Sequence, residues 1–311
     1  TGLPDGFIMS VLVTSDKKFL VSPGYNGLWV MDISAGVSGQ NFKRFQDVEE
    51  LENSSVRSMF EDDFGNLWIG SYGHGILFYG KNSPGFMVYS DMPENSVTSL
   101  DFSPNGKLLA GTDGGGINVI DADFNVVDIS HGKNFDRSIF SICHDSSGNI
   151  WVGSFNGPTI VTDPLLNHKA ELQIPEVRDF YEQDGFMWVV SGYRGLYLLD
   201  LRTFKELHRY SAPDYFPDNY LRNISIDKKG NIWLGTLRSG LFVYDSEMNR
   251  IASYNTDSGF PSNTVNHLML DRKGNIWAAT AEGLVCFNDG DEIDYFKVEF
   301  NEEGSENVKA V

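Results

Sequence analysis

The sequence predicts an all-β fold, a single seven-bladed β-propeller whose blades are four-stranded antiparallel sheets. A first observation is a recurring motif, an Asp-x-x-Gly-Asn segment with its Gly three residues before a Trp or Leu, nearly whole at 61–79 and 227–241. The equivalent Trp or Leu positions are Leu20, Trp68, Leu109, Trp151, Trp188, Trp233 and Trp277. They recur at intervals of roughly 40 to 50 residues, which is typical of a propeller. The motif is rich in Val, Ile, Trp and Tyr, which favours strands and argues against helical repeats.

The second repeat shows how each blade is expected to form. Its predicted strands cover residues 56–60, 67–71, 76–79 and 86–89. The Asp-x-x-Gly-Asn segment between the first two is a hairpin turn, because Gly adopts the positive φ that other residues resist. The Trp of the second strand is interpreted as core that fills the space between one blade and the next, not as a ligand platform.

The repeats divide the chain into blades at about 1–45, 46–90, 91–132, 133–173, 174–210, 211–255 and 256–300, with residues 301–311 as a tail or linker. No strand is obviously borrowed from the opposite terminus, so ring closure is expected to depend on packing. The residues expected at this contact are Trp277, Phe287 and Phe296 of the last blade and Phe7, Leu12 and Leu20 of the first. The alternative is that residues 292–300 pair with the first repeat as its outer strand.

Composition limits the classes of partner. A net charge of −19 leaves no basic surface for phosphates, so nucleic acid is not expected as a partner. Cys143 and Cys286 fall on distant blades, so no disulfide is expected. No apolar run is long enough to span a membrane, and direct membrane insertion is not expected. The opening residues 1–4 are similar to the inter-blade linker at 258–263, which suggests a piece of a longer protein.

Motifs for catalysis or metal binding are not found in the sequence. Its six histidines lack metal-binding spacing, and Gly114-Gly115-Gly116 lacks the Lys-Ser/Thr of a phosphate loop. The Asp of each Asp-x-x-Gly turn could suggest calcium, but its expected role is to hydrogen-bond the backbone of its own turn. We therefore expect no catalytic residues, no metal and no cofactor.

The turns between second and third strands should surround one entrance of the central channel. They carry aromatic residues beside Asn, Arg and Asp, a combination that suits a sugar because rings stack on C–H surfaces and polar groups take hydroxyls. The candidate ligand-binding residues, some of them from neighbouring strands and linkers, are Tyr25, Tyr72, His74, Phe155, Tyr193, Arg194, Arg222, Arg238 and Tyr215. The alternative is that these turns are polar only because they are exposed.

Arginines gather in the fifth and sixth repeats. Arg178 and Arg222 each occupy the second residue of a first strand, as Arg57 does in the second repeat, and Arg194 and Arg238 lie in the turns of the same two repeats. These four of the chain's eleven arginines, Arg178, Arg194, Arg222 and Arg238, are expected on one side of the mouth, beside the linker aromatics Tyr215, Phe216 and Tyr220. Either Asp179, Asp214 or Asp218 compensates their charge, or an anionic ligand such as a uronate or sulfated sugar does.

The segment Asp-x-x-Gly-Asn-Ile-Trp-x-Gly-Thr-x-x-x-Gly-Leu at 227–241 resembles the two-component regulator propeller repeat, and the Gly-Phe-Pro-Ser-Asn-Thr-Val segment at 259–265 resembles that family's linker. The resemblance implies the periplasmic sensor region of an inner-membrane hybrid two-component system of the Bacteroidetes type. It implies a non-catalytic module that detects a polysaccharide-derived oligosaccharide or relays its binding, within a parent sensor histidine kinase. Neighbouring sensor domains of the same chain are the implied partners, and a homodimer is a further possibility.

Two other functions stay open. Streptogramin-type lyases are similar seven-bladed propellers that use a His and acidic residues with magnesium, and His74 and Glu282 lie in turns that could face such a mouth. A propeller that serves only as a protein–protein interaction module is the other, because a fold does not determine a function.

Overall fold

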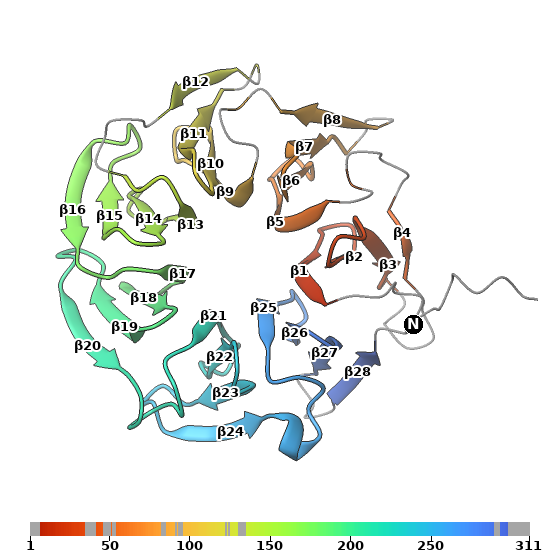
Figure 1. Cartoon of the computed structure of the whole chain (residues 1–311), viewed down its shortest axis with the longest axis vertical. Helices are drawn as coiled ribbons and strands as arrows, with labels where there is room; N and C mark the ends of the chain where they lie inside the picture. The colour runs from red at the N-terminus through yellow and green to blue at the C-terminus, as the bar shows by residue number, and fades with distance from the viewer. Residues whose placement is uncertain are drawn as a thin grey trace, which may run out of the picture.

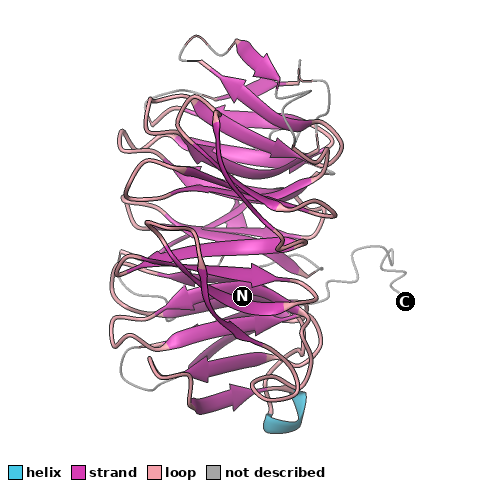
Figure 2. Ribbon diagram, turned by 90° about the vertical axis from the view of Figure 1, so that its left-hand side faces the viewer, coloured by secondary structure: helices cyan, strands magenta, loops and turns pink. Residues whose placement is uncertain are grey.

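The structure is a computed structural model that describes residues 7–34, 42–45, 51, 54–81, 85–90, 92, 96–121, 123, 125–129, 135–288 and 293–297. Seven four-stranded antiparallel sheets form a ring around a central opening (Figure 1). Seen from the side, the strands run between the two faces of the ring (Figure 2). The predicted fold class is therefore confirmed. The predicted tail 301–311 lies outside the described residues.

Each blade uses its strands in sequence order from the channel outwards. The innermost strands are β1 (Ile8–Val13), β5 (Ser55–Glu61), β9 (Val97–Phe102), β13 (Ile139–His144), β17 (Val177–Gln183), β21 (Leu221–Ile226) and β25 (Val265–Leu270). The second strands are β2 (Lys18–Pro23), β6 (Leu67–Tyr72), β10 (Leu108–Thr112), β14 (Ile150–Ser154), β18 (Phe186–Ser191), β22 (Ile232–Thr236) and β26 (Ile276–Thr280).

The third strand of each blade is largely buried, and exposure increases at the outermost strand. The third strands are β3 (Trp29–Asp32), β7 (Gly75–Tyr79), β11 (Gly116–Ile120), β15 (Thr159–Thr162), β19 (Gly195–Asp200), β23 (Leu241–Tyr244) and β27 (Gly283–Phe287). The outermost strands are β4 (Lys43–Arg44), β8 (Phe86–Tyr89), β12 (Val126–Ile129), β16 (His168–Leu172), β20 (Glu206–Tyr210), β24 (Arg250–Tyr254) and β28 (Ile293–Lys297). A 3₁₀ helix, η1 (Thr256–Ser258), follows β24. The strands predicted in the second repeat match β5 to β8 within one residue at each end.

The Asp-x-x-Gly-Asn turn is held by its own carboxylate. Asp145 Oδ1 accepts hydrogen bonds from the backbone N–H groups of Ser147 (3.0 Å) and Asn149 (2.8 Å). Its Oδ2 accepts from Asn149 Nδ2 and from Trp151 Nε1, both at 2.8 Å, and Gly148 takes a φ of 81°. The turns of Asp62, Asp227 and Asp271 repeat these bonds. The expected role of the Asp is confirmed, and the bond to the indole explains the fixed distance between Asp and Trp.

Apolar side chains fill each space between neighbouring blades. The described core divides into seven clusters, one for each pair of adjacent blades. Each cluster contains the Trp or Leu that the repeat alignment made equivalent, and that residue packs against the following blade. The interpretation of these tryptophans as core is therefore confirmed.

A glycine two residues after the Trp permits this close packing. A Cβ placed on Gly153 would lie 2.7 Å from Cβ of Val177, the first residue of the next inner strand. Real Cβ atoms do not approach so closely, and the same conflict arises at Gly70, Gly111 and Gly235. The Trp-x-Gly spacing thus sets how near the next inner strand can approach.

The ring closes by packing between blades 7 and 1. The Phe19 and Trp277 rings lie 4.2 Å apart in a cluster that also holds Ile8 and Cys286. Two hydrogen bonds add to this contact: Val11 N–H donates to His267 Nδ1 (3.4 Å), and Asn266 Nδ2 donates to the Ile8 carbonyl (2.7 Å).

Several details of the closure prediction are wrong. Residues of β28 pair with β27 of their own blade, and β4 is the outer strand of blade 1. Leu20 packs towards blade 2 and Phe287 towards blade 6 instead of meeting across the closure. The cause is that each blade turns one face to each neighbour, so only one of two adjacent residues can face a given blade. The side chain of Phe296 lies outside the described residues.

Two expectations about the whole chain can be compared with the structure. Cys143 is half-buried and Cys286 buried, and no disulfide joins them. Within the described ranges no helix has the length and apolar character needed to cross a membrane.

Replacing the buried Trp233 by Ala should lower the free energy of unfolding by about 3–5 kcal/mol, because the deletion leaves a cavity between blades 6 and 7 and removes the indole bond to Asp227. Urea unfolding at equilibrium measures the loss. Phe64→Ala is the control, since the Phe64 side chain is 82% exposed and should cost less than about 0.5 kcal/mol. A loss below about 1 kcal/mol at Trp233 would contradict the packing described above.

Closure predicts energetic coupling between Phe19 and Trp277. A double-mutant cycle with Ala at both positions should show a coupling of about 0.5–1.5 kcal/mol, because the two rings touch. Phe19→Ala combined with Trp151→Ala, which lies in another cluster, should be additive within about 0.5 kcal/mol. Additivity in both pairs would mean an open ring.

Candidate functional site

Every inner strand carries a one-residue β-bulge near its start, at the third residue in β5 and at the second in the other six. In β17, for example, Val177 pairs with Ser191 and Asp179 with Val190, so Arg178 has no partner in the ladder. The residues skipped in this way, called the bulge ring below, are Met9, Arg57, Thr98, Phe140, Arg178, Arg222 and Asn266. A bulge re-aims the side chain that it skips. All seven side chains line one cavity of about 510 Å³ in the central channel.

The next position of the inner strands forms a second layer, called the polar ring: Ser10, Ser58, Ser99, Ser141, Asp179, Asn223 and His267. Several of its members accept a backbone N–H from the following blade. Ser99 Oγ accepts from Ile142 (3.0 Å) and Asp179 Oδ2 from Ile224 (3.0 Å), in the same way that His267 accepts from Val11. The polar ring therefore joins blades around the channel. Two of its buried atoms, Ser58 Oγ and Asn223 Oδ1, have no hydrogen-bond partner in the described part of the chain.

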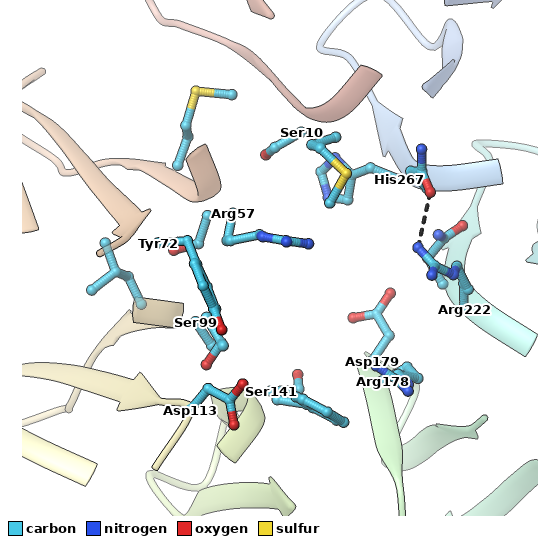
Figure 3. Close-up of a pocket in the computed structure, with 18 of the residues that line it drawn as sticks. Ser10, Arg57, Tyr72, Ser99, Asp113, Ser141, Arg178, Asp179, Arg222 and His267 are labelled. Atoms are coloured by element: carbon cyan, nitrogen blue, oxygen red, sulfur yellow. Dashed lines mark hydrogen bonds between the residues drawn. The ribbon is translucent and has the colours of Figure 1, made fainter. Parts of the chain in front are cut away.

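Three arginines of the bulge ring enter the cavity (Figure 3). Arg178 donates to Glu176 Oε1 at 2.6 Å and lies over the Phe140 ring, with its Cζ 4.2 Å from the centroid. Arg222 donates through Nη1 to Asn266 Oδ1 at 2.8 Å, the bond dashed in Figure 3. Arg57 has its Cζ 5.4 Å from the centroid of the Tyr72 ring. Burial, followed by the positive charges of Arg178 and Arg57, lowers the pKa of Arg222.

The charge of these arginines is only partly compensated by protein groups. Glu176 pairs with Arg178, whereas no carboxylate among the described residues lies within ion-pair distance of Arg57 or Arg222. Asp179, one of the expected compensating groups, accepts instead from the backbone N–H groups of Phe180 (2.9 Å) and Ile224 (3.0 Å). The expectation that Asp179, Asp214 or Asp218 pairs with these arginines is therefore wrong for Arg178, because Glu176, two residues earlier, is within reach of it.

Two groups of the polar ring have displaced pKa values. Burial raises the pKa of Asp179 to about 7, and the two backbone hydrogen bonds lower it only in part. Burial lowers the pKa of His267 to about 4. Its Nδ1 accepts a backbone hydrogen bond, which agrees with a neutral ring. At neutral pH the polar ring therefore carries less negative charge than an Asp179 carboxylate with an ordinary pKa would give it.

Five of the candidate residues from the sequence lie in the cavity or beside its mouth. Tyr25, Tyr72 and Arg222 line the cavity, and the two tyrosine side chains are 58% and 44% exposed. Tyr193 and Arg238 flank the Tyr220 ring beside the mouth: the Tyr193 ring meets it edge-on at 5.2 Å, and Arg238 Cζ lies 4.0 Å above it. Tyr193 and Tyr220 share a shallow depression with Arg178 and Arg222.

The remaining candidates do not line this cavity. Phe155 meets Phe140 edge-on at 5.2 Å, and His74 and Arg194 are exposed in their turns. Tyr215 lies far from the mouth, in a separate cavity of about 380 Å³ beside Tyr244 and Arg250, where its carbonyl accepts from Tyr244 Oη. The expected position of Tyr215 beside the arginines is therefore wrong: its ring packs on Tyr210 of the outer strand β20.

The cavity also holds residues that are not among the candidates from the sequence. The recurrence of arginine at one position in the repeat points to Arg57 and Arg178, but not to Phe140, Asn266, Asp179 and His267 as site residues. The signal that finds them is their position in the repeat, because the equivalent residues of all seven repeats line the cavity.

No three His, Cys, Asp or Glu side chains of the described ranges are grouped as a metal site requires. His74 and Glu282 lie in the turns of blades 2 and 7, with blade 1 between them.

Comparison with known proteins identifies the repeats. The family described as "two component regulator propeller" matches residues 50–73, 135–156, 215–238 and 259–282. The extracellular domain of a hybrid two component system from B. thetaiotaomicron is 32% identical over 97% of this chain, with a TM-score of 0.61. The chain spans 41% of the length of that structure. No curated protein matches the sequence significantly.

More distant structures share the fold alone. A streptogramin B lyase superposes with a TM-score of 0.73 at 15% identity, over 95% of this chain and 96% of its own. PorZ, a surface component of the type-IX secretion system of Porphyromonas gingivalis, superposes with a TM-score of 0.68 at 16% identity, over 89% of this chain and 46% of its own. At such identities the likeness concerns architecture and carries no function.

The displaced pKa values of Asp179 and His267 predict opposite effects of pH on stability. Between about pH 4 and 6.5 the unfolded chain binds a proton at His267 that the folded protein does not, so the contribution of His267 to stability falls as pH falls. Between about pH 4 and 7 the folded protein holds a proton on Asp179 that the unfolded chain releases, so the contribution of Asp179 falls as pH rises. In wild type the two contributions partly cancel.

Single variants should separate these contributions. Relative to wild type, Asp179→Asn should gain stability as pH rises through this window, and His267→Gln should gain as pH falls, each by at most roughly 1.4 kcal/mol per pH unit. Urea unfolding at several pH values measures both differences, in which other titrating groups cancel. Differences that do not change with pH would show that these groups titrate as in the unfolded chain.

Proposed function

The chain belongs to the two component regulator propeller family, and from that premise we propose that it is a non-catalytic sensor module of a hybrid two-component system. The module lies outside the cytoplasm, in the periplasm, as part of an inner-membrane sensor histidine kinase. It detects an oligosaccharide released from a polysaccharide, or relays the binding of one. The observation that carries the proposal is the 32% identity over 97% of the chain to an extracellular domain of such a system.

A binding role agrees with the chemistry of the channel cavity. Its acidic and histidine side chains already hold the backbone or a neighbour: Asp179 and His267 accept N–H groups, and Asp113 accepts from Ser138 Oγ at 2.7 Å. These hydrogen bonds give each of the three side chains a role in supporting the fold. The groups that remain available, Tyr25, Tyr72 and the arginines, are of the kind that binds sugars.

The position of the cavity also suits a sensor. Every inner strand of the ring contributes residues to its lining, so the cavity connects all seven blades. Neighbouring sensor domains of the parent protein, or a second copy of it, are the proposed receivers of the signal. The propeller in this proposal supplies recognition, and the kinase activity belongs to other parts of the parent protein.

Titration calorimetry of an oligosaccharide panel, on this propeller and on the complete extracytoplasmic region in parallel, tests the proposal. We expect one panel member to bind both proteins with similar affinity. Tyr72→Ala and Arg222→Ala should each weaken that binding by about tenfold or more, since a hydrogen bond to a charged group contributes about 1.5–3 kcal/mol. Binding by the complete region alone, unaffected by Arg222→Ala, would place the ligand on a neighbouring domain.

A further inference from the structure

The fold does not require arginine in the bulge ring. The seven equivalent positions carry Met, Arg, Thr, Phe, Arg, Arg and Asn, and each blade forms the same bulge whichever residue is present. Thr98, Phe140 and Met9 show that a neutral or apolar side chain satisfies this position. The three arginines therefore need an explanation other than the architecture.

The three guanidinium groups share one cavity at a cost. Arg178 and Arg57 both lower the pKa of Arg222, which shows that their charges repel it. Among the residues that the structure describes, only Arg178 has a carboxylate within ion-pair distance, Glu176. The chain carries 43 acidic residues against 24 basic ones, so its sequence offers many carboxylates that could have paired with Arg57 and Arg222. Asp113 and Asp179 also line the cavity, but Asp113 accepts from Ser138 Oγ and Asp179 from backbone N–H groups. Arginines that lack a close carboxylate partner in a cavity are typical of a site that receives its counter-charge from a ligand.

The side of the cavity opposite Arg178 and Arg222 is aromatic. Tyr25 and Tyr72 come from blades 1 and 2, across the opening from blades 5 and 6, which supply Arg178 and Arg222 (Figure 1). Arg57 extends from the tyrosine side towards the middle (Figure 3). The cavity volume of about 510 Å³ is within the usual range for small-molecule sites.

We propose that this cavity binds an acidic saccharide, with its carboxylate or sulfate group at Arg57, Arg178 and Arg222 and a sugar ring against Tyr25 and Tyr72. The planar guanidinium fork matches the two oxygens of either anion. The aromatic faces take the C–H surface of the sugar. This inference rests on the proposed function and names the ligand class for the same site.

The experiment uses simple probes that contain the separate parts of such a ligand. Sodium sulfate, sodium glucuronate and glucose are titrated into the protein at constant ionic strength, with chloride as the balancing ion, and binding is followed by NMR. Sulfate and glucuronate should saturate wild type, and glucose should bind more weakly than glucuronate. Arg57→Gln combined with Arg222→Gln should weaken binding of both anions by about ten- to a hundredfold, as expected for lost charge-assisted contacts.

Matched variants separate specific contacts from net charge. Arg202→Gln removes a charge from an exposed turn between β19 and β20, on the face away from the entrance, and should leave anion binding unchanged. Tyr25→Ala should weaken glucuronate binding and leave sulfate binding unchanged. A thermal unfolding transition close to that of wild type confirms that each variant is folded.

The proposal is overturned if sulfate and glucuronate bind wild type and the double arginine variant equally, including the case in which neither protein binds them. It is also overturned if Arg202→Gln weakens anion binding as much as the double variant does. Failure here is distinct from failure of the sensor proposal. A neutral panel oligosaccharide that binds the propeller while both anions do not would preserve the sensor and remove the acidic ligand. Anion binding at the arginines, with no panel saccharide bound, would preserve the anion site and remove the saccharide sensor.

Discussion

The structure depends on hydrophobic contact between neighbouring blades. A four-stranded blade is apolar on both faces, and it cannot bury either face alone. The Trp or Leu on the second strand of each blade fills the space in front of the next blade, and seven such contacts complete the ring. The Asp carboxylate of the preceding turn fixes the indole through its N–H, so local turn chemistry and long-range packing share one residue.

The same packing shapes the channel. In four blades a glycine on the second strand lets a residue at the start of the next inner strand approach within contact distance. The following residue is then skipped by the ladder as a bulge, and its side chain is directed into the channel. Adjacent positions of one strand therefore differ in role: the residue before the bulge is core, the skipped residue faces the channel, and the residue after it can join two blades. The lining of the channel can change at the skipped position while the core stays the same.

The distribution of charge suits a binding cavity. The chain carries a net charge of −19, whereas its channel cavity is lined by three arginines and two aspartates, Asp113 and Asp179, and the pKa of Asp179 lies near 7. The field of the arginines is concentrated at the entrance, because the low-dielectric walls screen it less than water does. The surrounding negative charge would repel large polyanions, which favours short fragments that can enter the channel.

The sequence by itself determined the number of blades, the strands of each blade and the turn that joins the first two. These features follow from residues that lie close together in the chain, such as Asp227, Gly230, Asn231 and Trp233, whose hydrogen bonds and backbone conformation need no distant partner. The sequence also placed Arg57, Arg178 and Arg222 at equivalent positions. Only the tertiary structure decided that they meet in one cavity, that Glu176 pairs with Arg178, and that Tyr215 packs on the outer wall. The physical reason is that these contacts join residues of different blades or depend on the course of a linker. Such contacts depend on how the closed ring orients each side chain, which the pattern within one repeat does not contain.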